Sequence, residues 1–290
     1  MTKIEWVVTV ANAIGGKPES WNPVTGCSHA SPGCRNCYAQ RLAGTRLLKS
    51  PRYKWLTQRT KRGPVWTGQV ECHDDLVLKP LGWRKRRAVF VCDMGDLFHE
   101  TVPDDFLDRV FAVMALCPDH IFMVLTKRAK RLQDYMLKTP QDLDMTVKNS
   151  YAHKLSVIAN QAIRPFSGIC WPPKNVWCGV SVENQYQAVM RISRLLETPA
   201  AVRFISAEPL LEAVDLSLWA PGLDWVICGG ESGPKARPMH PDWARKLRDQ
   251  CGQNGIRFFF KQWGEYAPGT VSSDGQDVFF SPDDKRLEKS

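Results

Sequence analysis

Short apolar runs alternate with amphipathic stretches along most of this sequence, and that order limits the folds open to the chain. The runs, rich in β-branched and aromatic residues, are Ala88–Cys92, Ile121–Leu125, Val176–Val182, Val202–Ile205, Trp225–Cys228 and Phe258–Phe260. The amphipathic stretches, with apolar residues at helical spacing, are Asp104–Cys117, Gln185–Leu196 and Pro241–Cys251. Apolar strands alternating with amphipathic helices predict βαβ units around a parallel sheet that is covered on both faces.

Polar residues or glycines follow each of these apolar runs. Asp93–Asp96 follow the first run, Lys127-Arg128 lie after the second, and Ser206–Glu208 follow the fourth. A (β/α) barrel builds its active site at the carboxyl ends of many strands, whereas a doubly wound sheet concentrates polar residues at one switch point. We therefore predict an α/β fold that is a complete or partial (β/α) barrel of the TIM type. Candidates for its first strands are Ser20–Pro23 and Gln69–Cys72.

The length of 290 residues fits one such barrel, which takes roughly 250 residues, so we expect residues 1–290 to form a single domain. The segments outside the alternating pattern are a cysteine loop (21–38), a basic segment (41–63), an irregular insertion (141–173) and a polar C-terminal tail (281–290). Neither a signal-peptide pattern nor a run of about 18 apolar residues occurs in the sequence. We therefore expect a cytoplasmic protein with no membrane partner.

The sequence contains ten cysteines, and most of them are scattered singly. The scattered ones are Cys72, Cys92, Cys117, Cys170, Cys178, Cys228 and Cys251. Several lie inside apolar runs, so we expect buried, reduced thiols that pack as small hydrophobic groups.

The cysteine loop holds the other three, Cys27, Cys34 and Cys37, with the spacing C-x6-C-x2-C. Glycines and prolines in the loop let the backbone turn around a metal. Three thiolates leave one position open in a four-iron cluster or a tetrahedral zinc site. Candidates for a fourth zinc ligand are His29, Cys72 and His73. From the spacing alone, an iron–sulfur cluster and zinc remain equal alternatives.

Positive charge is concentrated in the basic segment. The formal net charge is +9, and residues 41–63 contain eight Lys or Arg and no Asp or Glu. Aromatic residues lie between these cations, a pattern that suits phosphate neutralisation combined with base stacking. Further basic groups are Arg84–Arg87, Lys127-Arg128 and Lys130-Arg131. The pattern favours a nucleic acid or a nucleotide-like substrate as partner.

Eight motifs connect the chain to a known group of proteins. They are WNPVTGC, SPGCRNCYA, DMGDLFHE, LTKR, WCGVSVEN, ISAEPLL, ICGGESG and FFFKQWG, from about residue 20 to residue 264. Together they resemble a largely uncharacterised family of radical-SAM-like proteins, common in bacteriophages and mobile elements and close to the spore photoproduct lyase type of radical-SAM enzymes. The superfamily commonly spaces its cysteines C-x3-C-x2-C with an aromatic residue before the last. This chain has a longer first gap, with Asn36 before Cys37 and Tyr38 after it.

The resemblance implies a set of cofactors and ligands. Cys27, Cys34 and Cys37 would bind three irons of a [4Fe–4S] cluster, and S-adenosylmethionine (SAM) would bind the fourth through its amino and carboxylate groups. An electron donor such as a flavodoxin or ferredoxin is implied as well, in the cytoplasm of a bacterial host if the protein is phage-encoded. The candidate SAM-binding residues are Tyr38, Asp93, Gly95, Asp96, Lys127, Ser181, Glu183, Asn184, Ser206, Glu208 and Glu231.

The expected function is a radical-SAM enzyme of the isomerase or lyase type that acts on a nucleic-acid base or modified nucleoside, for example a hypermodified pyrimidine in phage DNA. The candidate substrate contacts are Arg52, Tyr53, Lys54, Trp55, Arg128 and Lys261. The alternative is a non-catalytic, zinc-stabilised nucleic-acid-binding protein, which explains the charge and the cysteines but leaves the polar strand ends without a role. No GxxxxGK[ST], HExxH or GxSxG motif indicates another chemistry.

Overall fold

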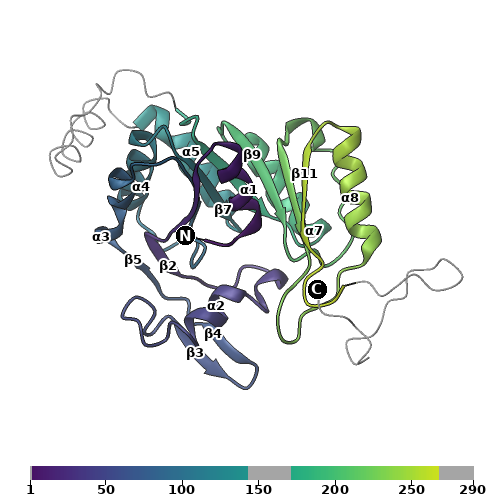
Figure 1. Ribbon diagram of the computed structural model, residues 1–290, viewed down its shortest axis with the longest axis horizontal. Coiled ribbons are helices and arrows are strands. Elements are labelled where there is room, and N and C mark those ends of the chain that lie inside the picture. Colours follow the sequence, from purple (N-terminus) through teal and green to yellow (C-terminus); the bar gives the residue numbers. More distant parts are fainter. Residues whose placement is uncertain (1, 143–170, 268–290) are drawn as a thin grey trace, which may run out of the picture.

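The computed structural model describes residues 2–142 and 171–267. Its central element is a seven-stranded parallel sheet with the order β1-β6-β7-β8-β9-β10-β11. The strands are β1 (Lys17–Trp21), β6 (Arg87–Val91), β7 (Ile121–Thr126), β8 (Val176–Ser181), β9 (Val202–Ala207), β10 (Trp225–Gly229) and β11 (Arg257–Gln262). The sheet curls into half a barrel with β1 and β11 at its edges (Figure 1). The predicted α/β class is confirmed, and in the described part of the chain the barrel is partial.

All six apolar runs form strands of this sheet. In β6 to β10 most residues are buried, as a parallel sheet covered on both faces requires, whereas β11, at the edge, has no fully buried residue. The candidate Ser20–Pro23 overlaps β1, which pairs in parallel with β6. The candidate Gln69–Cys72 is wrong as a barrel strand. It contains β5 (Val70–Cys72), which pairs antiparallel with β2 (Val24–Gly26) outside the main sheet. β5 is only three residues long, and its partner β2 lies outside the seven-stranded sheet as well.

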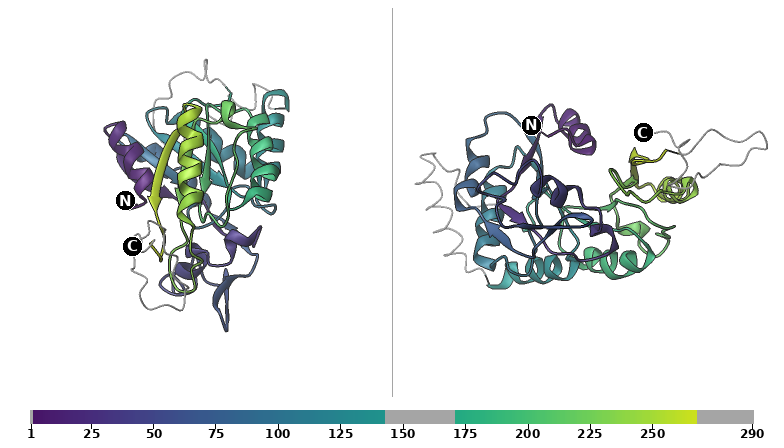
Figure 2. Two further views of the ribbon diagram at one scale, coloured as in Figure 1. Left: turned by 90° about the vertical axis from the view of Figure 1, so that its right-hand side faces the viewer. Right: turned by 90° about the horizontal axis from the view of Figure 1, so that it is seen from below.

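Helices cover the convex face of the sheet, as Figure 2 shows from below. They are α3 (Asp74–Val77), α4 (Asp104–Leu116), α5 (Ala129–Asp142), α7 (Gln185–Glu197) and α8 (Pro241–Gln253). On α4, Phe106 and Val110 pack in the same apolar core as Val89 and Val91 of β6. The predicted helices at 104–117, 185–196 and 241–251 are therefore confirmed. None of the described helices is both long and apolar enough to cross a membrane.

The concave face is closed by an N-terminal helix that the sequence analysis does not predict, α1 (Glu5–Ala13). Its Trp6 lies against Phe90 of β6 at 4.7 Å, Trp225 of β10 at 6.0 Å and Phe204 of β9 at 6.3 Å between ring centroids. These residues belong to a second apolar cluster, separate from the core under the outer helices. Because α1 contacts both β1 and β11, it occupies the open side of the half-barrel.

A small lobe projects from the half-barrel next to α1 and the cysteine loop. We call residues 38–66 the basic lobe. It consists of α2 (Tyr38–Ala43), a connecting loop and the antiparallel hairpin β3 (Thr57–Thr60) and β4 (Gly63–Trp66). Leu56 and Trp66 are buried in its own apolar cluster, onto which Cys27 and Cys37 pack. Figure 1 shows the hairpin extending beyond the rest of the described chain.

The remaining short elements are the 3₁₀ turns η1 (Pro32–Cys34), η2 (Lys79–Gly82) and η3 (Ala220–Gly222). Most of the predicted insertion at 141–173, namely residues 143–170, lies outside the described residues, and so does the whole predicted tail at 281–290.

Replacing Trp6 by alanine is expected to destabilise the protein strongly. The side chain is only 3% exposed and packs against three aromatic rings, and truncation of such a residue costs about 3–5 kcal/mol. Urea unfolding followed by circular dichroism measures the loss. The control is Leu218→Ala, which removes an 82% exposed side chain and should change the free energy of unfolding by less than about 0.5 kcal/mol. Equal losses in the two variants would contradict the role assigned to α1.

Candidate functional site

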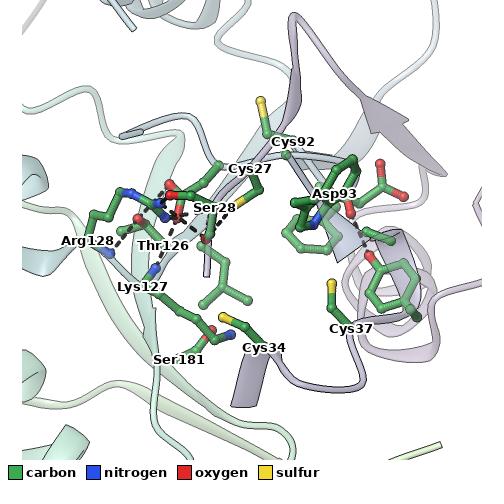
Figure 3. A pocket seen from close by; sticks show the side chains of 17 residues that line it. Cys27, Ser28, Cys34, Cys37, Cys92, Asp93, Thr126, Lys127, Arg128 and Ser181 are labelled. Carbon is green, nitrogen blue, oxygen red and sulfur yellow. Dashed lines mark hydrogen bonds and ion pairs between the residues drawn. The ribbon is translucent and has the colours of Figure 1, made fainter. Parts of the chain in front are cut away.

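The three clustered cysteines line one cavity at the carboxyl edge of the sheet. Cys27 follows β2, Cys34 ends η1, and Cys37 directly precedes α2. The cavity has a volume of about 130 Å³, well below the roughly 300–1,000 Å³ of pockets for organic ligands. Figure 3 shows the three sulfur atoms turned toward the same space. The fold thus brings together thiols that the sequence places within eleven residues of one another.

The thiols surround the cavity and do not converge on one point. Among residues 2–142 and 171–267, no three His, Cys, Asp or Glu side chains are close enough together to hold a single metal ion. Burial, with a contribution from Asp96, raises the pKa of Cys27 to about 12, although Arg128 acts in the opposite direction. Burial also raises the pKa of Cys37. Since only the thiolate binds metal, a bound cation must displace protons from these groups.

The first of three ion pairs that hold the cysteine loop joins Asp96 and Arg128. Asp96 follows β6 and Arg128 follows β7, and both side chains are buried, with Nη1 of Arg128 3.0 Å from Oδ2 of Asp96. Nη1 also donates to Sγ of Cys27 at 3.7 Å, and Nη2 donates to Oγ of Ser28 at 2.7 Å. Arg128, a predicted substrate contact, is therefore buried and bonded to the start of the cysteine loop.

The second pair joins Glu183, just after β8, to Arg191 on α7 at 2.9 Å, and both side chains are buried. The amide of Gly33 donates to Oε1 of Glu183 at 3.3 Å. Burial alone would raise the pKa of Glu183, but Arg191, Lys127 and hydrogen bonds from the cysteine loop lower it overall. Glu183, a predicted SAM contact, thus lies directly beneath the middle of the cysteine loop.

The third pair joins Glu231, after β10, to Arg237 at 2.6 Å. Nδ2 of Asn36 donates to Oε2 of Glu231 at 2.8 Å, and Nη2 of Arg237 donates to the carbonyl of Pro32 at 3.1 Å. Burial alone would raise the pKa of the Glu231 carboxyl, but the hydrogen bonds from Arg237 and Asn36 lower it overall. The predicted SAM contact Glu231 therefore binds the last part of the cysteine loop.

The segment after β6 closes the other side of the thiol cavity. Asp93 accepts hydrogen bonds from Asn22 at 2.6 Å and Ser20 at 3.1 Å, while its backbone carbonyl accepts from the hydroxyl of Tyr38 at 2.8 Å. Burial raises the pKa of Asp93. Position 95 requires glycine, because the backbone of Val24 packs so closely that a Cβ there would lie 2.9 Å from its carbonyl oxygen. Asp93, Gly95 and Tyr38, three of the candidate SAM-binding residues, all line the thiol cavity.

A larger cavity of about 550 Å³ adjoins the thiol cavity, a volume typical of sites for organic ligands. The two share parts of their linings, including Cys37, Tyr38, Phe90, Lys127 and Ser181. The larger cavity is also lined by Trp6, Ser206, Glu208, Glu231 and Lys261. We call these two spaces the thiol cavity and the large cavity. Together they bring side chains from the ends of six strands, β6 to β11, to one place.

Two ionisable groups of the large cavity form a pair. Nζ of Lys261 donates to Oε2 of Glu208 at 2.7 Å. The other oxygen of Glu208, Oε1, is buried and has no hydrogen-bond partner in the described part of the chain. No hydrogen bond or ion pair joins the Lys127 ammonium to another described residue. The Lys127 ammonium is therefore a donor at the large cavity, whereas Oε1 of Glu208, which is buried, can accept from a ligand only when the carboxylate turns toward the cavity.

Several predicted site residues lie away from both cavities. Asn184 caps α7 by accepting from the amide of Gln187 at 2.9 Å, and Arg52 pairs with Asp75. Tyr53 is half-buried against the lobe's apolar cluster, and Lys54 and Trp55 are exposed on the basic lobe. The candidate zinc ligands are also elsewhere, because His29 bonds Gln40, His73 bonds Thr25 and Cys72 is exposed.

The sequence analysis misses the residues that hold the cysteine loop, Arg191 and Arg237, and the cavity-lining Trp6 and Trp66. A signal for Arg191 exists, since it falls on the apolar stripe of a predicted helix, between the buried Ala188 and Leu195. A cation on such a stripe needs a buried partner. Trp6, Trp66 and Arg237 carry no comparable local signal.

The fold and the site define the class: an α/β half-barrel with a thiol-lined cavity at the carboxyl ends of its strands. A family model described as "Protein of unknown function (DUF5131)" matches residues 1–281. The chain belongs to this family. Comparison with curated proteins and with solved structures finds no match.

The Glu183–Arg191 pair predicts a specific pH dependence of stability. The pKa of Glu183 in the folded protein lies below its ordinary value of 4.5. The ion pair therefore contributes its full stabilisation of the folded state above about pH 4.5, and this stabilisation is lost as the pH falls through the pKa of the folded protein. Glu183→Gln is therefore expected to lower the free energy of unfolding by about 3–5 kcal/mol at neutral pH, because it leaves Arg191 buried without a counter-charge. The difference from the unsubstituted protein should shrink toward zero in acid.

Chemical denaturation at a series of pH values tests this expectation. The control is Asp134→Asn, which removes an exposed i,i+4 pair with Lys130 and should cost about 0.3–0.5 kcal/mol. A Glu183→Gln loss that is as small as the control's, or that does not change with pH, would show that the pair is not coupled to folding.

Proposed function

We propose that this protein is a radical-SAM enzyme that holds a [4Fe–4S] cluster on Cys27, Cys34 and Cys37. One observation carries the proposal: the three thiols surround a small cavity that opens into a large one at the carboxyl edge of a half-barrel. A cluster presents a different iron to each thiolate, so its ligands enclose a volume. A single zinc ion, with bonds of about 2.3 Å to every sulfur, requires ligands that meet at one point.

The residues present fit both cofactors. When bound, the reduced cluster would supply the electron that splits SAM into methionine and a 5′-deoxyadenosyl radical, which abstracts hydrogen from the substrate. The protein's part is to bind, orient and shield these groups. Arg128 donates to Cys27, and hydrogen bonds to cluster sulfurs raise the reduction potential.

The large cavity suits SAM through the two groups that it offers. A buried acceptor without a partner is costly, by about 1–3 kcal/mol, and Oε1 of Glu208 is such an acceptor. An ammonium donor of the ligand would satisfy it. Lys127 lines both cavities and would neutralise a carboxylate held between them. Ser181 and Ser206 add hydroxyls to the same wall.

We further propose a nucleic-acid base or modified nucleoside as the substrate, with isomerisation or lyase chemistry. The support is the positive charge of the basic lobe beside the thiol cavity. The alternative function, a zinc-stabilised nucleic-acid-binding protein, is less favoured because the candidate fourth ligands His29 and His73 are bonded to other side chains.

Cys34→Ala is expected to abolish cluster binding without unfolding the protein, because buried ion pairs hold the cysteine loop independently of the thiols. After anaerobic reconstitution, the unsubstituted protein should contain about four irons and four sulfides per chain, with a brown absorbance that bleaches on reduction. The variant should lose most of both. The control is Cys72→Ala, which removes an exposed thiol outside the cavity and should retain the cluster.

The decisive contrary result is one zinc per chain in a colourless protein, even after reconstitution with iron and sulfide. Loss of metal in Cys72→Ala as well would point to the zinc alternative, in which that residue closes the site.

Lys127→Met is expected to weaken SAM binding by about 10- to 100-fold, the usual range for removing a hydrogen bond to a charged group. Isothermal titration of SAM into the reconstituted protein measures the affinity. The matched control is Lys130→Met, three residues away on the exposed surface and paired with Asp134, which should bind SAM normally. Unchanged affinity in Lys127→Met would remove this residue from the SAM site.

A further inference from the structure

The side chain of Trp55 lies on the surface of the basic lobe and is not buried in its apolar cluster. Its side chain is 70% exposed, while Leu56, the next residue, is fully buried in the lobe's apolar cluster. The backbone at Trp55 has φ +81°, a left-handed conformation that costs a non-glycine residue about 1–3 kcal/mol and is concentrated at functional sites. The ammonium of Lys54 lies 5.0 Å from the centre of the indole ring. A costly backbone conformation thus accompanies a large aromatic surface left in water.

Cations are numerous in the segment that carries this ring, and the same segment contains no opposing charge. The exposed basic residues of the lobe are Arg46, Lys49, Lys54, Arg59, Lys61 and Arg62. Lys61 and Arg62 form the tip of the β3–β4 hairpin, which extends into solvent (Figure 2). Residues 41–63 contain no carboxylate, and among the described residues only Arg52 of this segment forms an ion pair, with Asp75. The lobe therefore presents positive charge in the same segment as an exposed aromatic ring.

The lobe is also a wall of the candidate active site. Tyr38, Ala39 and Trp66 belong to it and line the thiol cavity, and Tyr38 lines the large cavity too. A polymer bound on the outer surface of the lobe is therefore held by the same lobe that forms this wall.

We infer that the basic lobe binds an unpaired nucleic-acid strand, with one base stacked on Trp55 and the neighbouring phosphates neutralised by the lobe's cations. Delivery of a nearby base into the large cavity rests on the proposed function, but binding of the strand does not. An unpaired strand fits because its bases have free faces for stacking. A two-stranded ribbon can also enter the major groove of a duplex, but the base faces are stacked within the duplex and Trp55 would have no partner there.

Fluorescence anisotropy with labelled DNA and RNA oligonucleotides tests the inference. The probes are single strands of about 12 nucleotides, within the roughly 4–16 bound by single-strand-binding folds, and the same sequences annealed to a complement. We expect the single strand of DNA or RNA to bind more tightly than its duplex. Trp55→Ala should weaken binding by about 5- to 150-fold, the usual effect of losing one stacked base, while Trp55→Phe should keep most of the affinity.

The cations are tested by the dependence of affinity on salt. Lys61→Ala combined with Arg62→Ala should reduce the slope of log affinity against log salt by about 1.4, because each phosphate contact on a single strand contributes about 0.7. Matched controls outside the lobe are Tyr186→Ala, which removes a 65% exposed aromatic ring, and Lys246→Ala on α8. Both should bind the single strand as the unsubstituted protein does.

The inference is overturned if no strand binds, if the duplex binds as tightly as the single strand, or if Trp55→Ala and Tyr186→Ala have equal effects. Iron and sulfide are measured in the same preparation of unsubstituted protein. A protein that binds the strand but holds no cluster contradicts the proposed function alone. One that holds the cluster but binds no strand contradicts this inference alone.

Discussion

Pairing of buried carboxylates with arginines is the interaction on which the site depends. Asp96, Glu183 and Glu231 stand at the carboxyl ends of different strands, and each pairs with an arginine while one member of the pair bonds the cysteine loop. Pairs of this kind add little net stability, because desolvation offsets most of their attraction, but breaking one is expensive. Their effect is positional: they fix an irregular, glycine- and proline-rich segment against a rigid sheet.

This arrangement divides the polar residues at the strand ends between two tasks. Carboxylates that carry an arginine partner hold the cysteine loop, whereas Glu208, whose partner Lys261 satisfies only one of its oxygens, remains able to accept from a ligand. Lys127 belongs to the second group. Residue type alone does not distinguish the groups, since glutamates occur in both. The distinction comes from which side chains the curvature of the sheet places opposite an arginine.

The same distinction explains how far the sequence predicts this molecule. Strands are predicted well because their burial on both faces requires unbroken apolar runs, and the three thiols are predicted because their spacing is local. The sequence analysis assigns Asp96, Glu183 and Arg128 to ligands, although the fold pairs them with the cysteine loop or with one another. Their partners are distant in sequence, so no local pattern reveals them. Helix α1 is not predicted for a related reason. Its apolar residues pack against the concave face of the sheet, and this surface forms only when the sheet curls, so no local pattern reveals it.

The protein contacts that hold the cysteine loop also bear on the kind of metal site that we propose. In a zinc-stapled module the metal supplies the folding energy, and the ligand segments have little structure without it. Here the cysteine loop is held by Arg128, Glu183 and Glu231, and its thiols face a cavity that the sheet and the basic lobe enclose. A loop that protein contacts hold in place does not need a bound metal to keep its structure. Such a site suits a group that must react, because its ligands stay in place while its oxidation state and its fourth position change.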